Sequence, residues 1–88
     1  MKEKEMEQVL KAIANRRRLA IVRFLKGRKE ASVGDIAHEI KLSFKSTSRH
    51  LGTLTVAGVL DREQQGLTVF YRIASDLPLV AARVITIL

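Results

Sequence analysis

The sequence predicts a mainly α-helical domain with one small β-hairpin, and three observations support this prediction. Apolar residues recur at helical spacing in successive segments before residue 58. Two β-prone runs then flank a turn that contains glycine. A final apolar segment follows the only proline of the chain. With 88 residues, the chain is expected to form a single domain over residues 1–88.

The first helix is expected over about residues 3–14, behind a mixed-charge opening. Its packed positions recur at helical spacing: Met6, Val9, Leu10 and Ile13. Asn15 then breaks this helix or caps the next one, which ends near residue 27. Every charged residue from Gln8 to Lys29 is basic. This run indicates either a solvated helix face or phosphate contacts made by one of Arg16 to Arg18.

Two further helices are separated by a turn of only a few residues. Ser32, followed three residues later by Asp35, resembles a capping box that opens the first of them. That helix is expected to end around Lys41, and Ser43 is a candidate N-cap for the second, over about residues 43–57. Two short helices joined by so tight a turn form a helix-turn-helix.

The segment 43–57 has one face suited to packing and one suited to contact. On a helical wheel, Thr47, Leu51 and Leu54 share a narrow face, and short polar and cationic residues lie opposite. Hydroxyls and cations suit hydrogen bonds to phosphates and base edges better than they suit an apolar partner. We therefore interpret this segment as a DNA recognition helix. Its candidate contact residues are Ser43, Phe44, Lys45, Ser46, Ser48, Arg49 and Thr53.

Arg49 is the first choice among these contacts, against the alternative that it pairs with Glu63 or another surface acid. Ser43 can act as a cap, and a capped N-terminus also presents amides to phosphate. Phe44 lies toward the flank of the wheel, where it either packs or touches a thymine methyl group. His50 lies beside the packed face, so we expect a partly buried structural histidine rather than a metal ligand.

A β-hairpin is expected within residues 59–73, directly after the recognition helix. A hairpin at that place is the wing of a winged helix-turn-helix. Its turn is neutral, so we expect weak phosphate contact there, with Arg62 and Arg72 as the nearest cations. Arg62 and Arg18 complete the candidate DNA contacts.

A last helix is expected over about residues 77–88, opened by Ser75 or Asp76 with Pro78 in its first turn. This helix is apolar almost all round, so we do not expect it to be exposed. Together with the first helix, it is expected to pack against the same two elements of a second copy in a two-fold homodimer.

Composition and charge exclude several function classes. The 16 Lys and Arg against nine Asp and Glu give a net charge of +7, which favours a nucleic-acid partner. The absence of cysteine excludes disulfides and thiolate metal sites. No segment is long and apolar enough to span a membrane, and the charged N-terminus does not suit a secretory signal, so we expect a cytoplasmic protein without a membrane partner. No nucleophile and base lie at informative spacing, so we expect no enzyme and no cofactor.

Several of these motifs together resemble a known family. They are Ala14-Asn15, Arg18-Leu19, Leu42-Ser43, Ser48-Arg49-His50-Leu51, Leu54, Ala57-Gly58-Val59, and Gly66 through Tyr71-Arg72-Ile73. The pattern resembles the ArsR-type winged-helix transcriptional repressors of prokaryotes over about residues 9–74. This resemblance implies a homodimer, built on the first and last helices, that binds a palindromic operator and represses transcription until an inducer releases it.

The chain departs from the family pattern where members sense metal ions. Such members use cysteines and His or Asp pairs near helix ends, whereas this chain has no cysteine and only His38 and His50. We therefore expect no metal site and no cysteine-based metal sensor. The sequence does not identify an inducer. Gly52, inside the recognition helix, costs about 1 kcal/mol of helix stability relative to Ala. Close approach of the DNA backbone and simple drift explain it equally well.

The sequence thus predicts a sequence-specific regulator whose recognition helices enter successive major grooves of double-stranded DNA as a homodimer. Two alternatives stay open at this point. The same fold can act as a protein-interaction module, which the neutral wing favours slightly. It can also act as a non-specific architectural DNA-binding protein.

Overall fold

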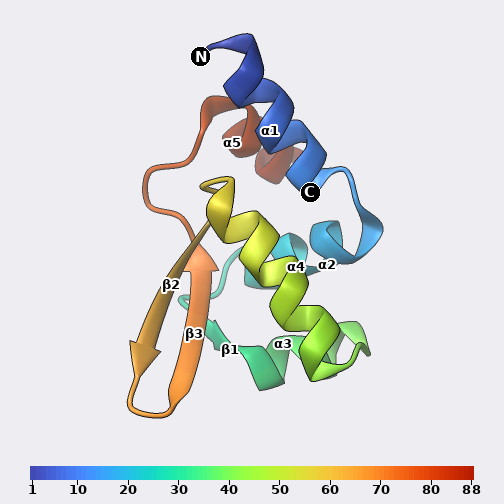
Figure 1. The fold of residues 1–88 in the computed structure, drawn as a ribbon, viewed down its shortest axis with the longest axis vertical. Helices are drawn as coiled ribbons and strands as arrows, with labels where there is room; N and C mark the ends of the chain where they lie inside the picture. The colour runs from blue at the N-terminus through green and yellow to red at the C-terminus, as the bar shows by residue number, and fades with distance from the viewer.

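The computed structural model describes residues 1–88 and contains five helices and three strands. The helices are α1 (Glu3–Ile13), α2 (Arg16–Leu25), α3 (Val33–Ile40), α4 (Phe44–Val56) and α5 (Leu79–Ile87). The strands are β1 (Ala31–Ser32), β2 (Leu60–Gln65) and β3 (Thr68–Ile73). The predicted fold class is confirmed: a mainly helical winged helix-turn-helix, with α3 and α4 as the helix pair and β2–β3 as the wing (Figure 1).

Side-chain caps begin the three central helices, because a cap satisfies a backbone N–H group that has no partner inside the helix. The side chain of Asn15 accepts from the N–H of Arg18 at the start of α2, at 3.1 Å. The Ser32 and Ser43 hydroxyls accept at the same distance, 3.1 Å, from the N–H groups three residues further on, at the start of α3 and α4. The predicted caps at all three positions are therefore confirmed.

The predicted opening of the last helix is wrong in detail. Pro78 occupies the N-cap position of α5, with no side-chain cap, so it precedes the first turn instead of lying inside it. Ser75 and Asp76 lie outside the helix, and the N–H of Ser75 donates to Asp61 Oδ2 at 3.2 Å. The fixed φ of proline is enough to start the helix without a hydroxyl or carboxylate cap.

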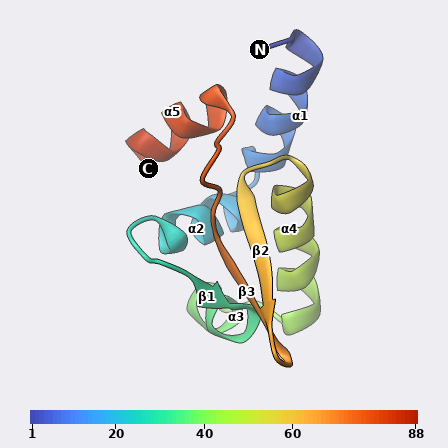
Figure 2. The ribbon, with the colours of Figure 1, turned by 90° about the vertical axis from the view of Figure 1, so that its left-hand side faces the viewer.

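The wing is part of a three-stranded antiparallel sheet with strand order β1-β3-β2. Strands β2 and β3 pair from Leu60↔Ile73 to Gln65↔Thr68, and Gly66 in the turn has a φ of +64°. A positive φ in a two-residue hairpin turn favours glycine. Strand β1 adds a short edge by pairing Ala31 with Tyr71, so the hairpin is joined to the start of α3 (Figure 2).

The core lies where α2, α3, α4 and the base of the wing meet. Its largest almost completely buried side chains come from all four parts: Ile21, Val22, Leu25, Ile36, Leu51, Leu54, Val59 and Leu60. A left-handed residue follows each of the three helices around it: Gly27 after α2 with a φ of +85°, Lys41 after α3 with a φ of +56° and Gly58 after α4 with a φ of +81°. The Lys41 turn leads from α3 into α4, and the Gly58 turn leads from α4 into β2.

Helices α1 and α5 lie together at the end of the molecule away from the wing tip (Figure 1). Both contribute to the core, through Val9 and Ile13 of α1 and Ala81 of α5. Both also leave large apolar side chains exposed: Met6, Leu10, Leu79 and Ile87. No helix of the chain combines the length and apolar character that crossing a bilayer requires.

Substitution of Thr47 tests the packing between α4 and the core. The Thr47 side chain is fully buried and its hydroxyl has no hydrogen-bond partner. Because an unpaired buried hydroxyl is unfavourable, Thr47→Val should raise the free energy of unfolding by about 1 kcal/mol in urea denaturation at fixed protein concentration. The matched control is Thr55→Val, because the Thr55 hydroxyl donates to the Leu51 carbonyl at 2.8 Å, and there no gain is expected. A loss of stability in Thr47→Val would contradict this account.

Candidate nucleic-acid interface

Helix α4 has one completely buried stripe, which determines the residues that face outward. Thr47, Leu51 and Leu54 have no solvent exposure. The predicted packed face is therefore confirmed. In a helix with 3.6 residues per turn, Lys45, Arg49 and Gly52 then lie on the opposite face, and Ser48 lies at its edge.

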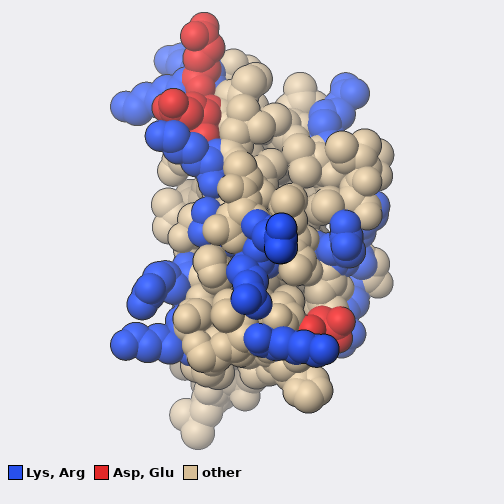
Figure 3. Space-filling model, turned by 90° about the vertical axis from the view of Figure 1, so that its right-hand side faces the viewer, with Lys and Arg blue, Asp and Glu red and all other residues tan.

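The two cations of this face form no ion pair within the chain. Lys45 and Arg49 are exposed, and the ion pairs of the structure involve only Lys11 with Glu7 and Arg72 with Asp61 and Glu63. Among the charged side chains, Lys and Arg are more numerous than Asp and Glu on the side of the molecule where α2 and α4 lie in Figure 1 (Figure 3). Both side chains are thus available to an anionic partner.

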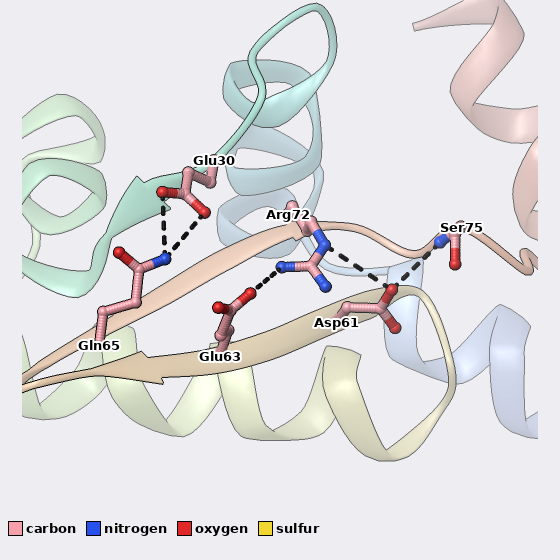
Figure 4. Close-up of polar contacts among 6 residues, drawn as sticks. All are labelled: Glu30, Asp61, Glu63, Gln65, Arg72 and Ser75. Carbon is pink, nitrogen blue, oxygen red and sulfur yellow. Dashed lines mark hydrogen bonds and ion pairs between the residues drawn. The ribbon is translucent and has the colours of Figure 1, made fainter.

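The alternative prediction that Arg49 pairs with Glu63 is wrong, because Glu63 pairs with another arginine. Arg72 lies opposite Asp61 in the β2–β3 register, and its guanidinium reaches Glu63 at 3.0 Å and Asp61 at 4.0 Å (Figure 4). These two carboxylates balance the charge of Arg72. Of the two cations predicted near the wing, only Arg62 stays exposed without an ion pair.

The wing tip carries no cation and presents an apolar side chain. Leu67 is fully exposed, at 102% of its reference area. The amide of Gln65 donates to both carboxylate oxygens of Glu30 at 3.4 Å, so this side chain is directed across the sheet, from β2 toward the start of β1 (Figure 4). The tip therefore offers little electrostatic attraction for phosphate.

A cleft of about 530 Å³ separates the wing from the start of α4 and α3. Phe44, Ser48, Arg62 and Leu67 are among the residues that line it. The side chain of Phe44 is 63% exposed, so the interpretation of Phe44 as a packing residue is wrong for the single chain. Its first-turn position turns it away from the core stripe and toward the cleft.

The hydroxyl-bearing candidates differ in how free they are. The Ser43 side chain accepts from the Ser46 N–H, and the Thr53 hydroxyl donates to the Arg49 carbonyl at 3.3 Å. Ser46 and Ser48 are half-buried and make no hydrogen bond through their side chains within the chain.

Val56 was not predicted as a contact because it is apolar, yet it is 78% exposed. It lies seven residues after Arg49, and this helical spacing is the signal that could have identified it.

Arg18 is the one cationic candidate whose charged group is engaged between helices. Its guanidinium lies between α1 and α4, where it bonds to the carbonyls of Lys11 and Ala12 and to His50 Nδ1. These contacts do not support a phosphate contact by Arg18, which remains only a prediction. Among the neighbouring arginines, Arg17 is exposed and donates only a long bond, 3.4 Å, to the Ile40 carbonyl.

His50 is the half-buried structural histidine that the sequence predicts. Its Nδ1 lies 3.1 Å from Arg18 Nη1. Since an arginine can only donate, Nδ1 must accept, and the neutral ring carries its proton on Nε2. Burial lowers the pKa of His50 below its ordinary 6.5, and the charges of Arg18, Arg17 and Arg49 lower it further. No group of three or more His, Asp or Glu side chains is arranged to hold a metal ion.

The lowered pKa of His50 predicts a pH-dependent stability. Below pH 6.5 the unfolded chain takes up this proton more readily than the folded chain. The folded state therefore loses stability as the pH falls from 6.5 toward the lowered pKa. In urea denaturation at a series of pH values, the wild type should lose more stability over this range than His50→Asn, which cannot be protonated. Parallel curves for the two proteins would contradict the prediction.

The chain is similar to known bacterial regulatory proteins in both sequence and structure. The family described as "Bacterial regulatory protein, arsR family" matches residues 15–62. Among curated relatives, the transcriptional activator HlyU of Vibrio cholerae is 39% identical over 67 residues, which cover 76% of this chain and 61% of that protein. The arsenical resistance operon repressor of Escherichia coli is 36% identical over 78 residues, which cover 89% of this chain and 67% of that protein. The chain thus spans about three fifths to two thirds of these relatives.

Solved structures show the same similarity in three dimensions. HlyU from Vibrio cholerae has a TM-score of 0.83 and 31% identity, and the match covers 99% of this chain and 92% of that one. A homodimeric winged helix-turn-helix DNA-binding domain from Mycobacterium bovis has a TM-score of 0.81 and 30% identity. That match covers 96% of this chain and 74% of the other.

Proposed function

Because this chain belongs to the bacterial ArsR family of DNA-binding transcription regulators, we propose that it is a homodimeric repressor that recognises a palindromic operator through α4. The observation that carries the proposal is the outward face of α4. Its two cations, Lys45 and Arg49, form no ion pair, and the buried stripe behind them holds the helix in place. The family is not an enzyme family.

The shape of α4 suits the major groove of B-form DNA. The groove is about 12 Å wide and admits one α-helix, whose N-terminal residues reach the base edges. Lys45, Ser48 and Arg49 all lie in the N-terminal half of α4. Arg49 is assigned to a guanine, because arginine donates two hydrogen bonds to the N7 and O6 acceptors of that base.

Groups around the start of α4 supply contacts to phosphate. The backbone N–H groups of the first turn carry the positive end of the helix dipole. Arg62 of the wing lines the cleft next to this turn. In a complex with α4 in the major groove, the sugar–phosphate backbone passes this cleft. Contacts there add salt-dependent affinity but contribute little to the choice of sequence.

A homodimer accounts for the apolar surface of α1 and α5. Met6, Leu10, Leu79 and Ile87 expose large apolar side chains on these two helices. An isologous contact would bury the same patch of both copies. The similar domain from Mycobacterium bovis is described as homodimeric, which supports this arrangement.

Repression is the simpler consequence of operator binding, because a bound dimer can exclude polymerase without a further contact. The similar Escherichia coli protein is named a repressor, whereas HlyU is named an activator. A reporter gene under an operator selected by this protein decides between the two: expression should rise when the gene for this regulator is deleted. A fall in expression would show activation.

Substitution of Arg49 tests the recognition helix. Arg49→Ala should cost about 1 to 3 kcal/mol of binding free energy on the preferred duplex and much less on random duplex, because it removes a base contact. The measurement is a fluorescence anisotropy titration at fixed salt, after selection of bound duplexes from a random pool. Arg28→Ala is the matched control. Arg28 lies in the loop between α2 and β1, which is on the opposite side of the molecule from α4 (Figure 2).

Three outcomes would count against the proposed role. Equal losses on both duplexes in Arg49→Ala would reduce Arg49 to a phosphate contact. No enriched sequence in the selection would leave a non-specific architectural protein. No binding to any duplex at low salt would favour the protein-interaction module, whereas a steep linear fall of log affinity with log salt supports DNA binding.

Substitution of Ile87 tests the proposed dimer. Ile87 is 84% exposed in the single chain, so Ile87→Glu should leave the subunit folded. A buried carboxylate at the proposed contact should turn the dimer into a monomer in sedimentation analysis and abolish tight operator binding. Leu67→Glu is the control, because Leu67 is also a highly exposed apolar residue but lies at the wing tip, and there the dimer should persist. A dimer that survives Ile87→Glu contradicts the assignment of this surface.

A further inference from the structure

An open groove separates α1 from the C-terminal half of α4. It has a volume of about 550 Å³ and is lined mostly by small or polar side chains, among them Ala12, Gly52 and Ala57. A Cβ atom added at Gly52 would meet no other atom within 4 Å. Side chains therefore make few contacts across this groove, and α1 is otherwise held by Val9 and Ile13, which pack into the core. Arg18 lines the groove too and bonds to both helices.

One end of this bridge completes the C-terminus of α1. The last four carbonyls of a helix have no partner inside it. In α1, the Leu10 carbonyl accepts from the N–H of Ala14 at 2.9 Å, and the Ile13 carbonyl accepts from the N–H of Asn15 at 2.8 Å. The remaining two, of Lys11 and Ala12, accept from Nη2 and Nε of Arg18, the first at 3.4 Å. A cation at this place also interacts favourably with the negative end of the helix dipole.

The other end of the bridge is on the recognition helix itself. Nη1 of Arg18 donates to His50 Nδ1 at 3.1 Å, across 32 residues of sequence. His50 lies between Arg49, which faces outward, and Leu51, which is fully buried. The capping bond from the Arg18 N–H to Asn15 holds the backbone of Arg18 at the start of α2. A single guanidinium thus connects α1, α2 and α4.

We propose that Arg18 is a positioning residue that sets the distance between the two recognition helices of the dimer. This inference rests on the proposed function, in which α1 belongs to the dimer contact and α4 enters the major groove. If α1 is held against its copy, the place of each α4 relative to the two-fold axis depends on the connection from α1 to α4. The open groove leaves Arg18 and His50 as the polar part of that connection.

Spacing of the half-sites measures this distance directly. The probe is the duplex that the wild type selects from a random pool, together with the same duplex lengthened by one central base pair. The extra pair moves one half-site by about 3.4 Å and turns it by about 34°. The wild type should bind the lengthened duplex at least about tenfold more weakly than the original, because its helices are held at one spacing.

Arg18→Lys is the test variant, because lysine keeps the charge but cannot donate to all three acceptors in the planar geometry of a guanidinium. Its affinities for the two duplexes should differ by no more than about threefold, because the variant loses affinity for the duplex with the original spacing. Arg17→Lys, next in the chain and exposed, is the matched control and should keep the wild-type ratio. Sedimentation and circular dichroism establish that each variant is a folded dimer.

Substitutions of His50 separate positioning from general stabilisation. His50→Asn keeps an acceptor near the place of Nδ1 and should retain spacing discrimination, whereas His50→Leu removes the acceptor and should lose it. General destabilisation would weaken binding to both duplexes by the same factor and leave their ratio unchanged. If Arg18→Lys and His50→Leu keep the wild-type ratio of affinities for the original and lengthened duplexes, this inference is overturned. Failure of the wild type to select any duplex would instead overturn the proposed function.

Discussion

The complete burial of one stripe of α4 is the constraint on which the rest of this structure depends. Leu51, Leu54 and Thr47 have no solvent exposure, and they pack where α2, α3 and the base of the wing meet. A rotation of α4 about its axis would expose two leucines and bury a cation, which is costly in both respects. The outward direction of Lys45 and Arg49 is therefore a consequence of core packing.

Much of the fold was predictable because its signals are local. Asn15, Ser32 and Ser43 are caps whose acceptors lie three residues from the N–H groups they satisfy, so sequence spacing alone identifies them. Gly58 ends α4 with a positive φ, as expected of a helix terminator. The packed and outward faces of α4 followed from helical periodicity, which is why its candidate contacts could be assigned to one face.

The features that sequence alone did not predict depend on contacts between distant residues. The extended segment Ala31–Ser32 pairs with β3, and this pairing joins residues far apart in the sequence, so local signals do not specify it. Glu63 pairs with Arg72 because of the register of the wing, which residue types alone do not specify. Arg18 and His50 meet across 32 residues, so the run of basic residues around Arg18 gave no sign of a structural role.

Two of these contacts, those of Arg72 and Arg18, also change which cations are available to DNA. Arg72 is balanced by two carboxylates and Arg18 is engaged between helices, so the face presented to a duplex depends on fewer side chains than the net charge of +7 suggests. In the proposed complex, choice of sequence then depends on the N-terminal half of α4, with the neutral wing contributing little. Gly52, which the sequence left unexplained, borders the groove that separates this helix from α1.

Protection of guanine N7 atoms from methylation by dimethyl sulfate tests the central claim most directly, because N7 lies in the major groove. On a selected duplex, the account predicts two protected patches, centred about 10 base pairs apart, each of which loses protection at one guanine in Arg49→Ala. Uniform protection along the duplex, or protection that Arg49→Ala leaves unchanged, would contradict the claim that the outward face of α4 reads the major groove.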